Sequence, residues 1–120
     1  MNRYTTTLDH TWLKEPLPLP VRRSLMLSAD RDLVAEEILE LKTNYGAIAG
    51  DWESGAIAYI AARNHVPCLI LRGVSDIVSP EGGEAYGNYG LFAQRAEEIM
   101  NTLLDSLPAW IAQAQTLSLR

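Results

Sequence analysis

The stretch GAIAGDWESGAIAYIAARNHVPCLILRGVSD, residues 46–76, decides the fold of this chain. It contains two apolar runs, Gly46–Gly50 and Pro67–Val74, separated by a segment over Glu53–Asn64 that has the composition of a helix. Apolar runs of this length are typical of strands covered on both faces, and a helix between two such strands predicts a right-handed parallel crossover. The stretch therefore predicts a β-α-β unit within an α/β fold.

Acidic residues follow each apolar run directly: Asp51 and Glu53 follow the first, and Asp76 follows the second. Each acid has a structural interpretation, because Asp51 suits a helix cap, Glu53 suits the first turn of a helix and Asp76 suits a turn. In open α/β sheets, however, ligands bind beyond the carboxyl ends of the strands. A carboxylic acid there can protonate a leaving group while a second carboxylate binds sugar hydroxyls, and Trp52 offers a flat apolar surface beside them.

The segments around this stretch extend the same pattern. Ser24–Ser28 is a short apolar run that predicts a strand, and the apolar residues after it recur at helical spacing, with Asp30 or Asp32 as the expected cap. Gly46 is expected to end that helix in the left-handed conformation. The next helix, over Glu53–Asn64, is small or apolar almost all round, which predicts that it is buried.

Beyond the second run, the glycine-rich segment Ser79–Gly90 is expected to be a loop, either a lid over a site or a solvated connector. From Leu91, apolar residues recur at intervals of three and four, which predicts a long amphipathic helix that Pro108 kinks or divides. The resulting order is β-α-β-α-β-loop-α. We therefore expect a three-layer α-β-α architecture with a mostly parallel sheet.

We expect an extended, proline-rich arm over residues 1–22 and one partial domain over residues 23–120. A parallel sheet of three strands would leave an edge strand unpaired, which natural proteins usually avoid. Further strands should therefore come from a longer parent domain or from another copy of the chain. A homo-oligomer, or an association that completes the sheet, is the expected state.

Composition narrows the possible functions. The chain has 120 residues, of which 48% are hydrophobic and 21% charged, as expected for one globular domain. A net charge of −5 argues against nucleic acid as a partner, and the apolar runs are too short to cross a membrane. A secretory signal is not evident and Cys68 is the one cysteine, so a cytoplasmic location is expected.

The sequence gives no indication of a metal or cofactor. The spacing of His10, His65 and Cys68 fits no metal-ligand template, and a glycine-rich phosphate loop before a helix is missing. The late lysine of a phosphate-accepting receiver domain is also missing, since Lys42 is the last lysine. A small-molecule ligand at the acidic strand ends is the expected partner.

Three segments, residues 28–30, 46–58 and 66–76, resemble the C-terminal half of the purine nucleoside phosphorylase and uridine phosphorylase superfamily. Within it they are most similar to methylthioadenosine/S-adenosylhomocysteine nucleosidases. The order, spacing and acidic positions together carry this resemblance, since each segment alone is a weak signal.

The resemblance implies a role for each of five residues. Asp76 would be the general acid that protonates the purine at N7, with Ser75 holding it in place. Glu53 would accept hydrogen bonds from the ribose 2′ and 3′ hydroxyls. Trp52 stands where the family commonly has methionine and would lie against the ribose, and Phe92 would line the pocket.

The resemblance further implies cleavage of the N-glycosidic bond of an adenine nucleoside, such as methylthioadenosine or S-adenosylhomocysteine, in nucleoside catabolism and purine salvage. The family's N-terminal half, which supplies the water-activating residue, has no counterpart before Ser24, so catalysis is expected to be incomplete without it. Two alternatives stay open: a phosphorylase that uses phosphate as the nucleophile, and a non-catalytic module that binds a nucleoside or a partner chain. Arg72, close before Asp76, opposes protonation of Asp76 unless its side chain points away.

Overall fold

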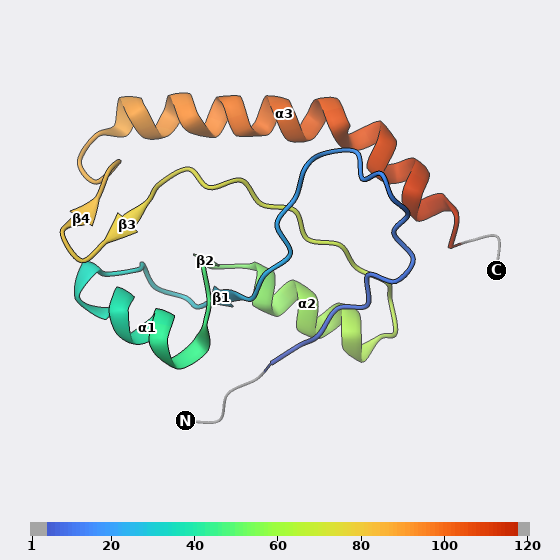
Figure 1. The fold of residues 1–120 in the computed structure, drawn as a ribbon, viewed down its shortest axis with the longest axis horizontal. Coiled ribbons are helices and arrows are strands. Elements are labelled where there is room, and N and C mark those ends of the chain that lie inside the picture. Colours follow the sequence, from blue (N-terminus) through green and yellow to red (C-terminus); the bar gives the residue numbers. More distant parts are fainter. Residues whose placement is uncertain (1–4, 118–120) are drawn as a thin grey trace.

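The computed structural model describes residues 5–117, which form a small α/β structure. Figure 1 shows α3 along one side, α1 and α2 along the other, and the strands and extended chain between them. In chain order the elements are β1 (Met26–Ser28), the 3₁₀ turn η1 (Ala35–Glu37), α1 (Ile38–Tyr45), β2 (Ala49–Asp51), α2 (Ser54–Arg63), β3 (Val78–Ser79), β4 (Gly82–Gly83) and α3 (Tyr89–Gln115).

The strands β1 and β2 pair in parallel, with Met26 opposite Ala49 and Ser28 opposite Asp51. The chain between them carries α1, so a parallel β-α-β connection joins the first two strands. The crossover predicted within residues 46–76, from Gly46–Gly50 to Pro67–Val74, is not observed in the described chain, because residues 67–74 form no strand there. This register sets the carboxyl ends of both strands side by side. Asp51 and the residues after it therefore lie at the edge of the sheet where ligands bind in α/β proteins.

The prediction of a third strand over Pro67–Val74 is wrong. Residues 67–77 run as extended chain between α2 and α3, and within the described residues they pair with neither β1 nor β2. An apolar run becomes a strand only where a neighbouring backbone supplies donors and acceptors. In the part of the chain that the structure describes, β1 and β2 pair only with each other. The expected loop Ser79–Gly90 also contains a short antiparallel hairpin, β3–β4.

The first helix ends as expected but begins differently. Gly46 follows α1 with a φ of 63°, and its N–H donates to the carbonyl of Lys42 at 2.9 Å. The expected capping by Asp30 or Asp32 is wrong, because η1 begins after Val34, and no side chain accepts a hydrogen bond there or at the start of α1.

The core of the described chain is small. Its buried apolar residues are Trp12, Ala47, Ala58 and Trp110. The prediction that the second helix is buried is wrong, since α2 buries only Ser54 and Ala58. Its large apolar residues are exposed because α2 covers the sheet with one side and nothing in the described chain covers the other.

The helix α3 runs through Pro108 as one element, so the proline does not divide it. Its C-terminal part holds the N-terminal arm. The Lys14 N–H donates to Oε1 of Gln113 at 2.8 Å, and Nε2 of Gln113 donates to the Lys14 carbonyl at 2.7 Å. Trp12 is buried and donates to the Asp9 carbonyl at 2.8 Å. Over residues 5–117, no helix has the length and apolar character needed to cross a membrane.

Candidate functional site

Asp51 lies at the carboxyl end of β2, where the chain turns into α2. Its Oδ1 accepts a hydrogen bond from the Ser54 N–H at 3.1 Å, and its Oδ2 accepts one from the Ser54 hydroxyl. Asp51 therefore accepts a hydrogen bond from the first residue of α2, as a cap would, although the N-cap position itself is Glu53. Its side chain is 12% exposed, so this carboxylate is largely withdrawn from solvent.

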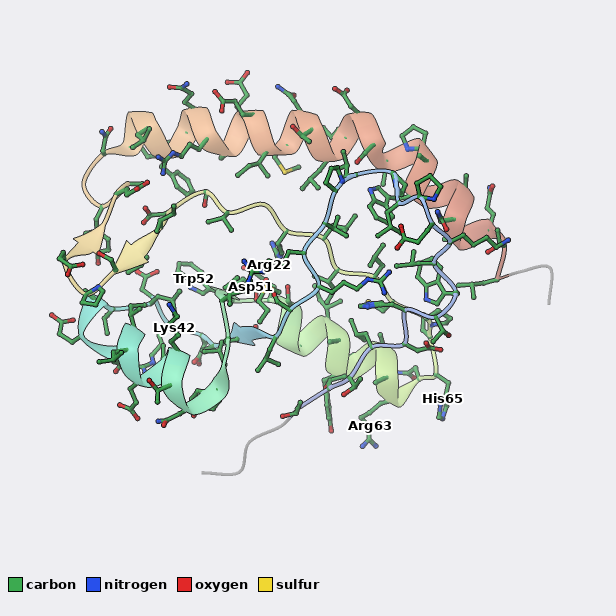
Figure 2. The ribbon with its side chains drawn as sticks, viewed as in Figure 1. Arg22, Lys42, Asp51, Trp52, Arg63 and His65 are labelled. Atoms are coloured by element: carbon green, nitrogen blue, oxygen red, sulfur yellow. The ribbon has the colours of Figure 1, made fainter. Side chains whose placement is uncertain are left out.

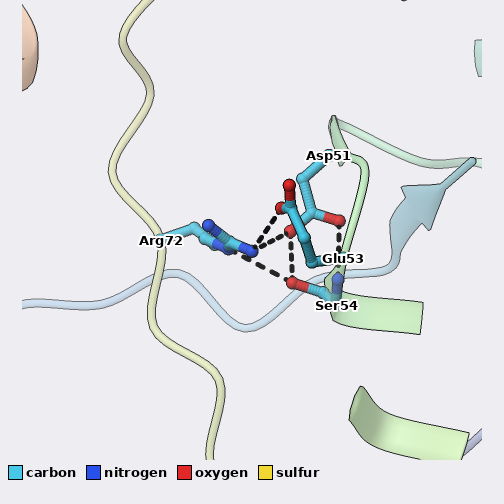
Figure 3. Close-up of polar contacts among 4 residues, drawn as sticks. All are labelled: Asp51, Glu53, Ser54 and Arg72. Atoms are coloured by element: carbon cyan, nitrogen blue, oxygen red, sulfur yellow. Dashed lines mark hydrogen bonds and ion pairs between the residues drawn. The ribbon is translucent and has the colours of Figure 1, made fainter. Parts of the chain in front are cut away.

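The guanidinium of Arg72 joins this strand end to the extended chain. Its Nη2 lies 2.6 Å from Oδ2 of Asp51 and 3.1 Å from Oε2 of Glu53, and its Nε donates to the Ser54 hydroxyl at 3.2 Å. Figure 3 shows these contacts converging on one side chain. We call Asp51, Glu53, Ser54 and Arg72 the Arg72 cluster. It fixes the extended chain against the start of α2.

The two carboxylates of the Arg72 cluster, Asp51 and Glu53, lie in different environments. Burial by itself would raise the pKa of Asp51, but hydrogen bonds from Ser54 and Ser28 and the charge of Arg72 outweigh it, so this pKa lies below its ordinary value. Asp51 is therefore charged at neutral pH. Glu53 has one contact with Arg72, and its side chain is 59% exposed, which leaves its other oxygen open to a ligand.

Asp76 lies on the extended chain just before β3. Its Oδ1 accepts a hydrogen bond from the Ala85 N–H at 2.8 Å, which ties the chain to the loop beyond β4. Its Oδ2 lies against Gly83, where an added Cβ would stand 2.7 Å away. The preceding residue, Ser75, accepts a hydrogen bond through its carbonyl from Arg95 of α3 at 3.5 Å.

The two aromatic residues expected at the site are both partly exposed. Trp52 follows Asp51, and its side chain lies beside the end of β2 in the middle of the molecule (Figure 2). It is 59% exposed. Phe92 is in the first turn of α3, with its ring centroid 6.5 Å from that of Tyr89. Both rings offer apolar area to a ligand.

The structure brings the candidate residues together in two groups. Glu53 belongs to the Arg72 cluster, whereas Ser75 and Asp76 are tied to the β3–β4 loop and α3. Among the described residues, no hydrogen bond or ion pair joins Glu53 to Asp76. Arg72 is four residues before Asp76 and turns toward Asp51 and Glu53 instead.

The sequence analysis did not identify Arg72 as the link between these carboxylates. The available signal was the arginine itself, within an apolar run that follows two acids at the end of the preceding strand. Within residues 5–117, no three His, Cys, Asp or Glu side chains form a group that could hold a metal ion.

Comparison with known proteins identifies relatives of this chain. The family model described as the phosphorylase superfamily matches residues 19–108. A 5′-methylthioadenosine/S-adenosylhomocysteine nucleosidase from Halalkalibacterium halodurans is 34% identical over 74 residues, which are 59% of this chain and 32% of that protein. The chain thus spans about a third of the length of this curated relative. No solved structure matches the chain significantly.

Proposed function

This chain belongs to the phosphorylase superfamily, and from that premise we propose that it carries part of a nucleosidase site. The substrate would be an adenine nucleoside such as methylthioadenosine or S-adenosylhomocysteine, cleaved at its N-glycosidic bond. The name of the partly matched relative supports this substrate class. The observation that carries the proposal is the half-exposed carboxylate of Glu53, held at a strand end by Arg72.

Glu53 would bind the ribose. Cleavage of an N-glycosidic bond passes through a sugar with oxocarbenium character, as in glycoside hydrolysis. A carboxylate that accepts hydrogen bonds from the two ribose hydroxyls would also stabilise the positive charge that develops on the sugar. The contact with Arg72, at 3.1 Å, would hold the Glu53 carboxylate in place without using both of its oxygens.

Asp76 would be the proton donor, with Ser75 positioning it. Its Oδ1 is occupied by the Ala85 N–H, so Oδ2 would carry the proton toward N7 of the purine. Proton donation to the purine requires the neutral form of this carboxyl group. The guanidinium of Arg72, which would favour the charged form, is engaged by Asp51 and Glu53.

Trp52 and Phe92 would supply the apolar walls of the pocket. A large ring at Trp52 would lie against the ribose and restrict which 5′ substituents fit beside it. The exposed fraction is 59% for Trp52 and 43% for Phe92. A nucleoside would therefore bury apolar area on both.

A direct assay separates hydrolysis from the alternatives. The chain is incubated with methylthioadenosine in phosphate-free buffer, and adenine release is followed. Release there supports a nucleosidase, whereas release only after phosphate is added indicates a phosphorylase. Calorimetric binding of the nucleoside without release in either buffer supports a non-catalytic module.

Substitutions test the individual roles. Asp76→Asn should lower the turnover rate by about 10² to 10⁴, the usual contribution of a general acid, while nucleoside binding is retained. Glu53→Gln should weaken nucleoside binding. Glu81→Gln, an exposed change in the β3–β4 turn, serves as the control and should alter neither. Equal activity and affinity in all three variants would contradict the proposed site.

A further inference from the structure

The chain exposes more surface than a compact protein of its size. Its accessible surface is 9264 Å², whereas a compact monomer of this mass exposes about 6,450 Å². Its radius of gyration is 16.0 Å, against about 13.6 Å for a compact domain of the same length. The excess of about 2,800 Å² is comparable to what one partner contributes to a large obligate interface.

One part of this surface is an extended segment whose backbone has no strand partner in the described chain. Residues 67–74 are extended, and within residues 5–117 none of their backbone N–H or C=O groups bonds to another backbone group. The side chains of Cys68–Leu71 are half-buried, and α3 packs on the segment so closely that Ile99 would clash with a Cβ at Gly73. The segment is thus held in place while its backbone stays unpaired.

A second part is an apolar stripe on α3. The side of α3 that faces the chain includes the buried Ser106 and Trp110. The apolar stripe lies beside that side and consists of Met100, Leu104, Leu107 and Ile111. Each of these side chains is between 45% and 54% exposed. They follow one another at intervals of four, three and four residues, the spacing of a surface that packs against another element. This helix therefore presents a wider apolar face than the described chain covers.

We propose that residues 67–74 and the α3 stripe form the interface for the remaining part of a phosphorylase-superfamily domain. Strands of that part would pair with residues 67–74, and its apolar side chains would cover the stripe. The matched relative supports this occupant, since the aligned segment is 32% of its length and the rest supplies about twice as much polypeptide. A second copy of the chain is a less suitable occupant of this interface, because both copies carry a net charge of −5 and repel each other. The inference rests on the fold and not on the proposed chemistry.

Co-expression tests the interface. The 120-residue chain is produced together with the part of the H. halodurans nucleosidase that lies outside the aligned segment. We expect a one-to-one complex by light scattering, in which the amides of residues 68–74 exchange at least about tenfold more slowly than in the chain alone.

Two variants on α3 make the test specific. Leu104→Glu, which places a charge in the stripe, should weaken the complex at least about tenfold. Asn101→Glu, which adds the same charge at an exposed polar position of α3, should leave it unchanged. Equal effects of both variants would overturn the assignment of the stripe.

Three results would overturn the proposal itself. The first is a chain that is monomeric alone with residues 68–74 already protected from exchange. The second is a symmetric dimer of the chain that protects the same residues. The third is the lack of any complex with the relative's remaining part.

Discussion

Replacing Asp51 by Asn tests how much the Arg72 cluster stabilises the chain. Asp51 accepts hydrogen bonds from Ser54 of α2 and Ser28 of β1 and contacts Arg72 of the extended chain. It therefore connects three segments. Asn keeps the shape of the side chain, but it loses the charge and places an NH₂ group where one carboxylate oxygen accepted a hydrogen bond.

The expected loss of stability in Asp51→Asn follows from these contacts. A hydrogen bond to a charged group contributes about 1.5–3 kcal/mol, and the ion pair with the partly exposed Arg72 adds at most about 1 kcal/mol. Because Asn retains one acceptor, Asp51→Asn should lower the free energy of unfolding by about 2–3 kcal/mol at pH 7. Urea unfolding followed by tryptophan fluorescence measures this difference.

The pH dependence gives an independent check. The pKa of Asp51 in the folded chain lies below its ordinary value, because the hydrogen bonds from Ser54 and Ser28 outweigh the effect of burial. The stabilisation is therefore fully present above about pH 4, the unfolded value, and is lost as the pH falls through the lower folded value. The difference between the wild type and Asp51→Asn should narrow over that acid range.

The matched control is Asp30→Asn, since Asp30 also follows a strand but is exposed. It should change stability by less than about 0.5 kcal/mol. The reasoning would be refuted by an Asp51→Asn variant that is as stable at pH 7 as the Asp30→Asn control, or by a stability difference that stays constant down to acid pH.

Most features decided by neighbouring residues were predictable from the sequence, although the helix capping expected from Asp30 or Asp32 is not observed. The predicted helix over Glu53–Asn64 is observed as Ser54–Arg63, and Gly46 has the expected left-handed conformation. Both depend on local spacing and on the preference of glycine for positive φ. The predicted order of strand, helix and strand over residues 24–50 is also observed, as β1, α1 and β2 with the two strands in parallel.

The sequence did not predict correctly whether residues 67–74 pair with a strand or whether α2 is buried. The run around Cys68–Leu71 is apolar enough for a covered strand, but the sequence does not specify which backbone lies beside it. The same holds for α2, whose apolar residues indicate a cover that the described chain lacks. Both of these wrong predictions concern contacts between residues far apart in the sequence.

At the candidate site, too, the sequence indicated the residues but not the contacts between them. The sequence placed Asp51, Glu53 and Asp76 at the ends of apolar runs, because acids that follow such runs are visible in the sequence. It did not show that Arg72 turns away from Asp76. That choice depends on two carboxylates at the end of β2, which attract the guanidinium more strongly than one.

Three further substitutions test other contacts. Gly46→Ala should destabilise the chain by about 1 kcal/mol in urea unfolding, because a side chain is strained at a φ of 63°. Gly83→Ala should displace Asp76, since the new Cβ would stand 2.7 Å from its Oδ2; the loss of slow exchange at the Ala85 amide would report this, and an unchanged exchange rate would contradict it. Gln113→Ala removes both hydrogen bonds to Lys14 and should release the arm from α3, because these two bonds are the hydrogen bonds that join the arm to α3 within residues 5–117. Limited proteolysis within residues 5–20 should then become faster and tryptophan emission should shift to longer wavelength as Trp12 is exposed, whereas Gln115→Ala, an exposed change on the same helix, should leave both unchanged.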